Sequence, residues 1–278
     1  MFSKRFAISL VLAMSPALAQ VSSGPAATPD PAAISPRQHA PRRAYGFSSE
    51  RVVDNVTVSD STNWSGYAVT GSSFTQAKAS WTVPSVNCST TPNTYSSFWV
   101  GLDGWTSSTV EQTGTDSDCD GRTPSYYAWY EFYPAGSVLI GSVPVSPGNK
   151  MFAEVSYSGS TFTVTITNET TGKSFSKNGK VSGAARSSAE WIAEAPCCTR
   201  SGGILPLADF GTVDFGEDYT GISSTNYAMD SSANGPIGSF GSNIQEAIMV
   251  NGSTGADEAV PSSLSSDGTS FTVAWKSE

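Results

Sequence analysis

Carboxyl and carboxamide side chains are the groups left for chemistry in most of this chain. The sequence of 278 residues contains one histidine, His39, close to its beginning. The body of the chain therefore lacks the parts for Ser-His-Asp or Cys-His catalysis and for a histidine-ligated zinc site. It also lacks GxSxG, HExxH and glycine-rich phosphate-loop motifs. We expect no metal and no cofactor.

Hydrolysis by carboxyl groups remains, as glycosidases and aspartic peptidases perform it. Aspartic peptidases need two Asp-Thr/Ser-Gly motifs. The nearest strings in this chain are Asp267-Gly268-Thr269 and Asp257-Glu258, and neither has that pattern. The sequence therefore favours another way of pairing carboxyl groups.

The elements that must position these groups are β-strands. Beyond residue 60, short alternating runs rich in β-branched and aromatic residues are separated by Gly, Ser, Asn, Asp and Pro, and helical periodicity is nearly absent. Frequent short strands with turn signals predict one all-β domain, a sandwich or a barrel. Hairpins are expected to turn at Gly159 and around Gly172.

Alternation with a period of two assigns the side chains of four expected strands to faces. Each strand presents acid, amide or indole groups on a single face. This predicts a wide, carboxyl-lined groove across a sheet, of the kind that binds polymers. The side chains assigned to the chemical faces are Trp99, Gly101, Asp103, Val110, Gln112, Gly114, Asp116, Tyr127, Trp129, Glu131, Tyr133, Glu190, Ile192 and Glu194.

The first residues have the pattern of a secretory signal peptide, which we place at residues 1–19. Lys4 and Arg5 precede an apolar run, and Ala17-Leu18-Ala19 supplies the small residues of a cleavage site. That run is shorter than the roughly 20 residues of a membrane span. The sequence predicts a secreted protein.

Residues 20–53, here called the leader, are rich in Pro, Ala and Ser and carry several arginines. From Asp54 onward, nine Lys and Arg stand against 22 Asp and Glu, a formal charge of −13. A basic leader can bind an acidic body, so we expect an inhibitory propeptide, with a plain linker as the alternative. Its end lies between residues 51 and 61, and residues 54–278 form the catalytic domain. The acidic balance argues against nucleic-acid and membrane partners.

Four cysteines occur in the expected domain. In an exported chain they are expected to form disulfides. The spacing favours Cys88–Cys119 together with a bond between the neighbours Cys197 and Cys198, and crossed pairing is the alternative.

Five strings in order carry a resemblance over Asn63 to Trp275: NWSGYAV, FWVGLDG, VEQTGTD, YAWYEFYP and AEWIAE. Together they resemble the glutamic peptidases (the eqolisins), whose fold is a sandwich of two antiparallel sheets with the cleft on one concave face. The resemblance implies that Gln112 and Glu194 are the catalytic pair. It places around them Trp99, Asp103, Asp116 and Glu190, and along the cleft walls Trp64, Trp129, Glu131 and Tyr133. Tyr127 departs from the pattern, since an Asp is often found there.

The implied activity is an acid endopeptidase, acting on polypeptides as a monomer. A carboxyl group with an ordinary pKa of about 4.3 can be a general base in mild acid, and the Gln112 amide can donate to an oxyanion at any pH. Two alternatives stay open at this stage. One is a glycoside hydrolase using Glu194 with Glu131 or Glu190, and the other is a non-catalytic carbohydrate-binding module.

Overall fold

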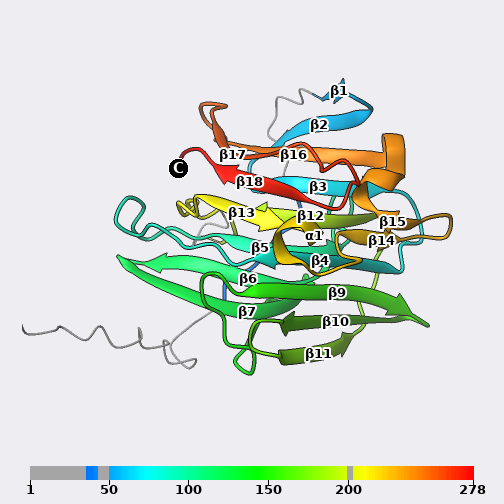
Figure 1. Cartoon of the computed structure of the whole chain (residues 1–278), viewed down its shortest axis with the longest axis horizontal. Helices are drawn as coiled ribbons and strands as arrows, with labels where there is room; N and C mark the ends of the chain where they lie inside the picture. The colour runs from blue at the N-terminus through cyan, green and yellow to red at the C-terminus, as the bar shows by residue number, and fades with distance from the viewer. Residues whose placement is uncertain (1–35, 43–49, 199–202) are drawn as a thin grey trace, which may run out of the picture.

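The computed structural model describes residues 36–42, 50–198 and 203–278. Strands dominate it, and they form two largely antiparallel sheets packed face to face (Figure 1). The expected signal peptide, residues 1–19, and most of the leader lie outside the described residues. Two parts of the leader are described: residues 36–42, called the docked segment below, and residues 50–53, which lead into the first sheet. Within the described ranges, no helix is long and apolar enough to cross a membrane.

The first sheet has the neighbour order β1-β2-β16-β3-β12-β5-β6-β7-β8, in which only β2 and β16 run parallel. Strand β5 therefore lies between β12 and β6. The bounds are β1 Arg51–Val53, β2 Val56–Ser61, β16 Ile244–Val250, β3 Trp64–Thr70, β12 Ser188–Glu194, β5 Ser97–Leu102, β6 Val110–Asp120, β7 Thr123–Tyr133 and β8 Val138–Ile140.

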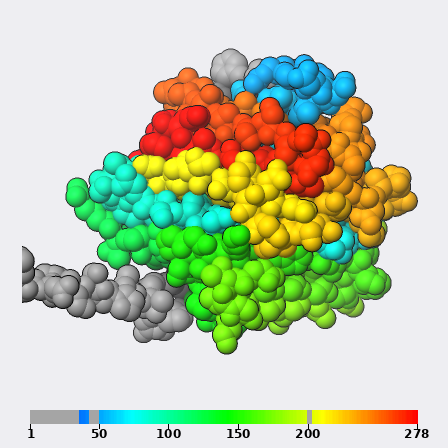
Figure 2. Space-filling model, in the orientation of Figure 1, coloured from blue at the N-terminus to red at the C-terminus, as the bar shows by residue number. Residues whose placement is uncertain are grey.

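The second sheet runs β11-β10-β9-β4, and the far edge of β4 pairs with β13 and β14. Strand β13 continues to β18 and β17, and β17 also pairs with β16, which joins the two sheets. Figure 2 shows green β9–β11 segments beside the yellow-to-red C-terminal third on one face of the molecule. The bounds are β11 Lys173–Gly179, β10 Thr161–Asn168, β9 Lys150–Ser158, β4 Gln76–Thr82, β13 Thr212–Phe215, β14 Tyr227–Met229, β15 Asn234–Pro236, β17 Asp257–Pro261, β18 Phe271–Trp275, helix α1 Glu217–Thr220 and the 3₁₀ helix η2 Ile237–Asn243.

The main hydrophobic core lies between the two sheets. Phe98 and Val100 of β5 contribute to it, and so do Trp81 of β4 and Val164 of β10, all fully buried. The alternate residues of β7, Tyr126, Ala128, Tyr130 and Phe132, belong to the same core. Two layers enclosing one core confirm the predicted β-sandwich, and the predicted hairpins at Gly159 and Gly172 are present.

The outer face of the first sheet carries a second apolar cluster. Trp64, Trp99, Trp129, Ile192 and Tyr127 belong to it, each from a strand position that alternates with a core residue. Period-2 alternation had assigned Trp99, Trp129 and Ile192 to this face, and the structure confirms that assignment. We call this surface the indole face.

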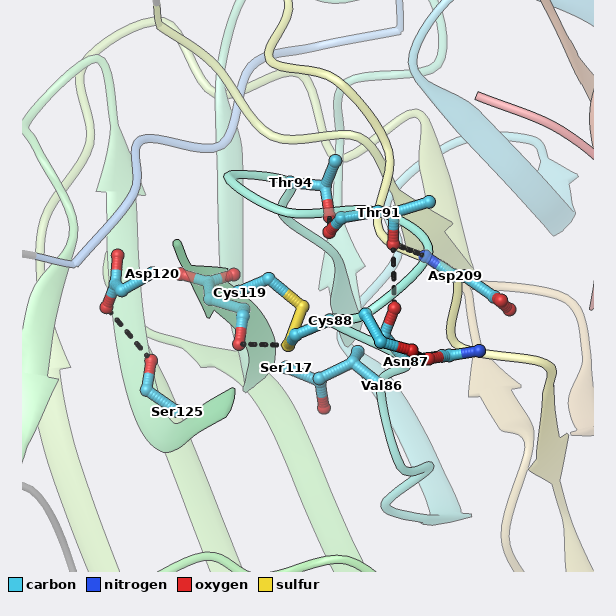
Figure 3. Close-up of a disulfide and its surroundings, with 12 residues drawn as sticks. Val86, Asn87, Cys88, Thr91, Thr94, Ser117, Cys119, Asp120, Ser125 and Asp209 are labelled. Carbon is cyan, nitrogen blue, oxygen red and sulfur yellow. Dashed lines mark hydrogen bonds between the residues drawn. A yellow bond between two sulfur atoms is a disulfide. The ribbon is translucent and has the colours of Figure 1, made fainter. Parts of the chain in front are cut away.

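Two disulfides close loops of the domain. Cys88 pairs with Cys119 and Cys197 pairs with Cys198, as the spacing favoured. The first bond ties the segment after β4 to the end of β6, beside Thr91 and Asp209, which are hydrogen-bonded to each other (Figure 3).

Candidate active site

Strand register brings Gln112 and Glu194 to the indole face. On β5, Gly101 lies opposite Gln112 of β6, and Ser97 lies opposite Glu194 of β12. Gly114 of β6 makes this packing possible, because a Cβ there would lie 2.4 Å from a backbone oxygen and 2.5 Å from the Trp99 side chain. Trp99 therefore packs its Cβ against β6, and its indole nitrogen reaches Glu194 at the end of β12.

The docked segment covers this part of the indole face. Its Gln38 forms an antiparallel bridge with Cys197, through Gln38 N–H to Cys197 O at 3.0 Å and Cys197 N–H to Gln38 O at 2.8 Å. At the other end, Arg42 N–H donates to Gly104 O at 3.2 Å. Between these anchors, His39 and Ala40 are almost completely buried. The docked segment thus lies on the indole face as an extended peptide.

One peptide bond of the docked segment contacts both members of the predicted pair. Gln112 Nε2 donates to the carbonyl oxygen of His39 at 3.3 Å. The N–H of Ala40, on the other side of the same bond, donates to Glu194 Oε1 at 3.2 Å. Trp99 Nε1 donates to the second carboxyl oxygen, Glu194 Oε2, at 2.8 Å and fixes its orientation. An amide donor and a carboxyl group therefore flank a single peptide bond.

Neighbouring groups hold the peptide on both sides of that bond. Glu131 Oε2 accepts the His39 backbone N–H at 3.2 Å and the Gln112 Nε2 donor at 2.9 Å. The carbonyl oxygen of Ala40 accepts from Trp64 Nε1 at 3.1 Å and from Asn63 Nδ2 at 3.4 Å. These hydrogen bonds hold the segment through its backbone N–H and C=O groups.

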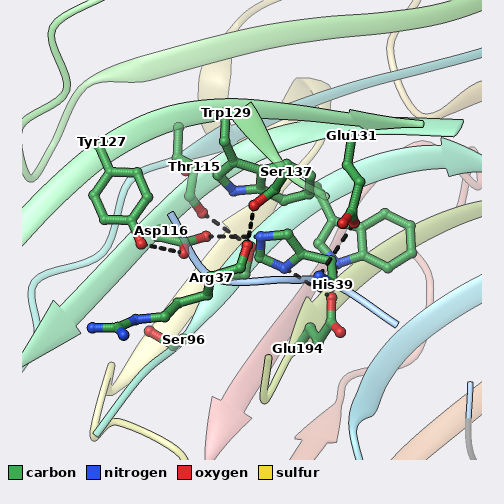
Figure 4. Close-up of polar contacts among 12 residues, drawn as sticks. Arg37, His39, Ser96, Thr115, Asp116, Tyr127, Trp129, Glu131, Ser137 and Glu194 are labelled. Carbon is green, nitrogen blue, oxygen red and sulfur yellow. Dashed lines mark hydrogen bonds and ion pairs between the residues drawn. The ribbon is translucent and has the colours of Figure 1, made fainter. Parts of the chain in front are cut away.

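The His39 side chain lies among carboxyl groups on an indole floor (Figure 4). Its ring stacks on Trp129 with centroids 3.6 Å apart. Nδ1 lies 3.3 Å from Glu194 Oε2, and Nε2 lies 3.8 Å from Asp116 Oδ1. The hydroxyl of Tyr127 donates to Asp116 Oδ2 at 2.8 Å and so holds that carboxyl group in place. We call this enclosure the imidazole pocket.

Two arginines flank the central bond and bind acidic or aromatic groups. The Arg37 guanidinium lies 3.3 Å from Asp118 and stacks 4.0 Å above the ring centre of Tyr95. The Arg42 guanidinium lies 4.1 Å above the ring centre of Trp105. Contacts of this kind follow from the opposite charges of leader and body.

Burial dominates the electrostatics of the covered site. It raises the pKa of Glu194 well above its ordinary value, and the nearby Glu131 raises it further. Burial also raises the pKa of Glu131 to about 9 and that of Asp116 to about 7. The same loss of solvent lowers the pKa of His39 well below 6.5. With the segment docked, neutral forms of these groups are therefore favoured.

Asp103 and Glu190 were expected around the pair, and Tyr133 along the cleft wall. Asp103 adopts a left-handed backbone (φ 70°), which interrupts the alternation of β5. Its carboxylate accepts the backbone N–H groups of Arg186 and Ser187 at 2.6 and 2.9 Å, so it orders that loop. Glu190 is fully buried, and burial together with the charges of Asp103 and Glu111 raises its pKa well above the ordinary value. Tyr133 packs at the edge of the indole cluster.

Other contact residues were not identified from the sequence. Asn63 lies within the NWSGYAV string, but its amide gave no sign of binding a peptide carbonyl. Tyr95 and Trp105 lie in loops without periodicity, and Asp118 lies two residues beyond the chemical face that was assigned. His39 carried one signal, since it is the only histidine of the chain and lies in a basic leader.

Comparison with known proteins assigns the chain to a family. Residues 62–273 match the Peptidase A4 family. The chain belongs to this family. It is similar to Aspergillopepsin-2 of Aspergillus niger (31% identity over 205 residues, covering 64% of this chain and 72% of the relative). It is also similar to Scytalidopepsin B of Scytalidium lignicola (31% over 192 residues, covering 66% and 72%).

A solved structure agrees with this assignment. Scytalido-glutamic peptidase with a transition state analog inhibitor aligns with a TM-score of 0.64 and 25% identity, covering 77% of this chain and 98% of that one. The resemblance to the glutamic peptidases is thereby confirmed, and this A4 peptidase is a hydrolase of peptide bonds. The glycoside hydrolase and binding-module interpretations are not supported.

Proposed function

We propose that this peptidase is a secreted acid endopeptidase in which Glu194 is the general base and acid and Gln112 stabilises the oxyanion. One observation carries the proposal: Gln112 contacts the carbonyl oxygen and Glu194 the amide nitrogen of one buried peptide bond. These are the atoms on which negative charge develops and to which a proton must be delivered when an amide is hydrolysed.

The proposed mechanism uses these two contacts in turn. Ionised Glu194 takes a proton from a water molecule that attacks the carbonyl carbon, while Gln112 Nε2 donates to the oxygen as it becomes negative. Protonated Glu194 then delivers its proton to the leaving nitrogen, near which Oε1 already lies. Trp99 holds the carboxyl group in position, and Glu131 holds the Gln112 amide. Removing one oxyanion donor typically lowers kcat by about 10²- to 10³-fold.

The proposal includes an inhibitory leader. The docked segment covers Gln112 and Glu194, so a substrate has no access while it is bound. Arg37 and Arg42 attach it to acidic and aromatic groups on either side. We propose that the secreted precursor is a monomeric zymogen that processes itself after acidification, and that it needs no cofactor.

Peptide hydrolysis at about pH 3–4 in the presence of pepstatin tests the assignment. Glu194→Gln and Gln112→Ala are each expected to lose at least about 100-fold in kcat. Glu169→Gln, which changes an exposed carboxyl group far from the site, serves as the matched control and is expected to keep full activity. Undiminished cleavage by both site variants would overturn the proposal.

A further inference from the structure

We propose that the docked segment is bound as a substrate, that the His39–Ala40 bond is the first bond the enzyme cleaves in its own leader, and that the imidazole pocket selects histidine before the cleaved bond. This inference rests on the proposed function. Water adds its hydroxyl group to the His39 carbonyl carbon and a proton to the Ala40 nitrogen. The products end at a His39 carboxyl group and begin at an Ala40 amine.

The first argument is register. Within residues 36–42, His39–Ala40 is the only peptide bond that contacts Gln112 and Glu194 together. The carbonyl of Gln38 binds Cys197 instead, and that of Pro41 binds Asn63.

The sequence of the docked segment resists a shift of this register. Moving it forward by one residue would bring the Ala40–Pro41 bond to the pair, and the Pro41 nitrogen has no hydrogen to donate to Glu194. Moving it back by one would place the Gln38 side chain in the imidazole pocket. Gln38 would also lose its two backbone hydrogen bonds to Cys197. The observed register gives Glu194 the N–H of Ala40 as a donor and keeps both backbone hydrogen bonds of Gln38 to Cys197.

The second argument is the chemistry of the imidazole pocket. Trp129 offers a flat aromatic floor, and carboxyl oxygens of Glu194 and Asp116 lie 3.3 and 3.8 Å from the two ring nitrogens. A planar ring with a nitrogen on each side can stack on Trp129 and place one nitrogen near each of the two carboxyl groups. Leucine would lose the stacking on Trp129 and would place no nitrogen beside the Asp116 and Glu194 carboxyl groups, and lysine would lose the stacking.

The cut would also dismantle the inhibitory contact. It separates the Arg37 anchor, on one product, from the Arg42 anchor, on the other, so each half is held by fewer bonds. The new terminus at Ala40 lies before the range of 51–61 expected from the sequence. Trimming within that range would enter β1 and β2, which are paired with each other and, through β2, with β16.

Mass spectrometry of the acidified precursor tests the cleavage site. The earliest products are expected to be a fragment ending at His39 and a chain beginning at Ala40. Their rate of formation should not change when the precursor is diluted tenfold, because the bond is cut within one molecule. An earliest terminus elsewhere would refute the inference, while the proposed function would survive if the same sample hydrolysed an added protein. Failure to hydrolyse any added protein would refute the proposed function itself.

Synthetic peptides test the imidazole pocket separately. The processed enzyme is given Pro-Arg-Gln-His-Ala-Pro-Arg-Arg, the sequence of residues 36–43, and the same peptide with Leu in place of His. We expect cleavage after His and a kcat/KM about tenfold or more lower for the Leu peptide, since differences in apolar contact discriminate by about 10- to 200-fold. A peptide with Ala in place of Gln is the control, and its kcat/KM should differ less from that of the His peptide. Equal kcat/KM for the His and Leu peptides would overturn the selectivity.

Discussion

The imidazole of His39 lies flat on the indole of Trp129, with ring centroids 3.6 Å apart and planes within 11°. This places the only histidine of the chain inside the candidate active site. A side chain absent from the body of the peptidase is thus supplied by its leader. Because Asp116 and Glu194 face its ring nitrogens, its protonation is tied to whether the docked segment stays bound.

Acid is expected to weaken docking through His39. Its pKa is lowered in the docked state, so its contribution to docking is fully present above pH 6.5 and is lost as pH falls toward the lowered value. The pKa values of Glu194, Glu131 and Asp116 are raised by the same burial, so their contribution runs the other way. Below about pH 4 they are protonated even when uncovered. Protonated His39 then opposes docking, and Arg37, which stays charged, loses the negative charge of its partner Asp118, whose pKa is raised by burial.

Nuclear magnetic resonance can follow this directly, because labelled histidine gives one imidazole signal when no histidine tag is used. In a Glu194→Gln precursor, which keeps the shape of the site, the imidazole should stay neutral well below pH 6.5. Adding His39→Phe should keep the docked segment protected from hydrogen exchange at pH 3, where the parent has become exposed. Gln38→Ala is the control. An imidazole that titrates near pH 6.5 while the segment remains protected would contradict the prediction.

Trp99→Phe should impair the peptidase by freeing Glu194. The substitution keeps an aromatic ring but removes the 2.8 Å donor to Glu194 Oε2. A buried hydrogen bond to a charged group contributes about 1.5–3 kcal/mol, so we expect kcat/KM to fall about 10- to 100-fold. The Trp99 donor also lowers the pKa of Glu194. The pH–rate profile should therefore move toward higher pH.

The control for Trp99→Phe is Trp105→Phe, which alters an indole that contacts the Arg42 guanidinium and not Glu194. Thermal unfolding of both variants identifies any loss of fold. A fall in kcat/KM without a shift of the pH profile would mean that Trp99 acts through packing alone.

Strand faces could be predicted from the sequence because they depend on local alternation. Trp99 and Phe98 are adjacent and differ in face, and the structure places one in the indole cluster and the other in the core. Gln112 and Glu194 reach one peptide bond because β5 pairs with both of their strands. The five ordered strings alone indicated that Gln112 and Glu194 act as a pair.

Two features could not be predicted in this way. Asp103 leaves the expected face because its backbone turns left-handed at the end of β5, and alternation ends where the strand ends. The docking of residues 36–42 depends on contacts with residues far along the chain, such as Cys197 and Glu194, and the segment has no hydrophobic periodicity of its own. Its opposite charge indicated binding, but not the bond that would meet Gln112.

Removing the Cys88–Cys119 disulfide should destabilise the domain and loosen the leader. The bond closes a loop of 31 residues, for which chain entropy gives about 3–4 kcal/mol. Cys119 is also next to Asp118, the partner of Arg37. We expect Cys88→Ser with Cys119→Ser to unfold at lower urea concentration and to release its leader sooner at a given pH. Unchanged urea midpoints would contradict the prediction.

The buried carboxyl group of Glu111 should make the fold more stable in acid. Burial and then the charge of Asp103 raise its pKa to about 9. Because the folded value exceeds the unfolded value of about 4.3, the protonated form stabilises the fold fully below about pH 4.3, and this stabilisation is lost as pH rises toward 9. One such group changes the free energy of unfolding by at most about 1.4 kcal/mol per pH unit. Glu111→Gln should therefore flatten the decline in stability between pH 4 and pH 8, measured by urea unfolding in the Glu194→Gln background to prevent self-digestion. The exposed Glu169→Gln is the control, and a slope equal to that of the parent would show that Glu111 does not carry this dependence.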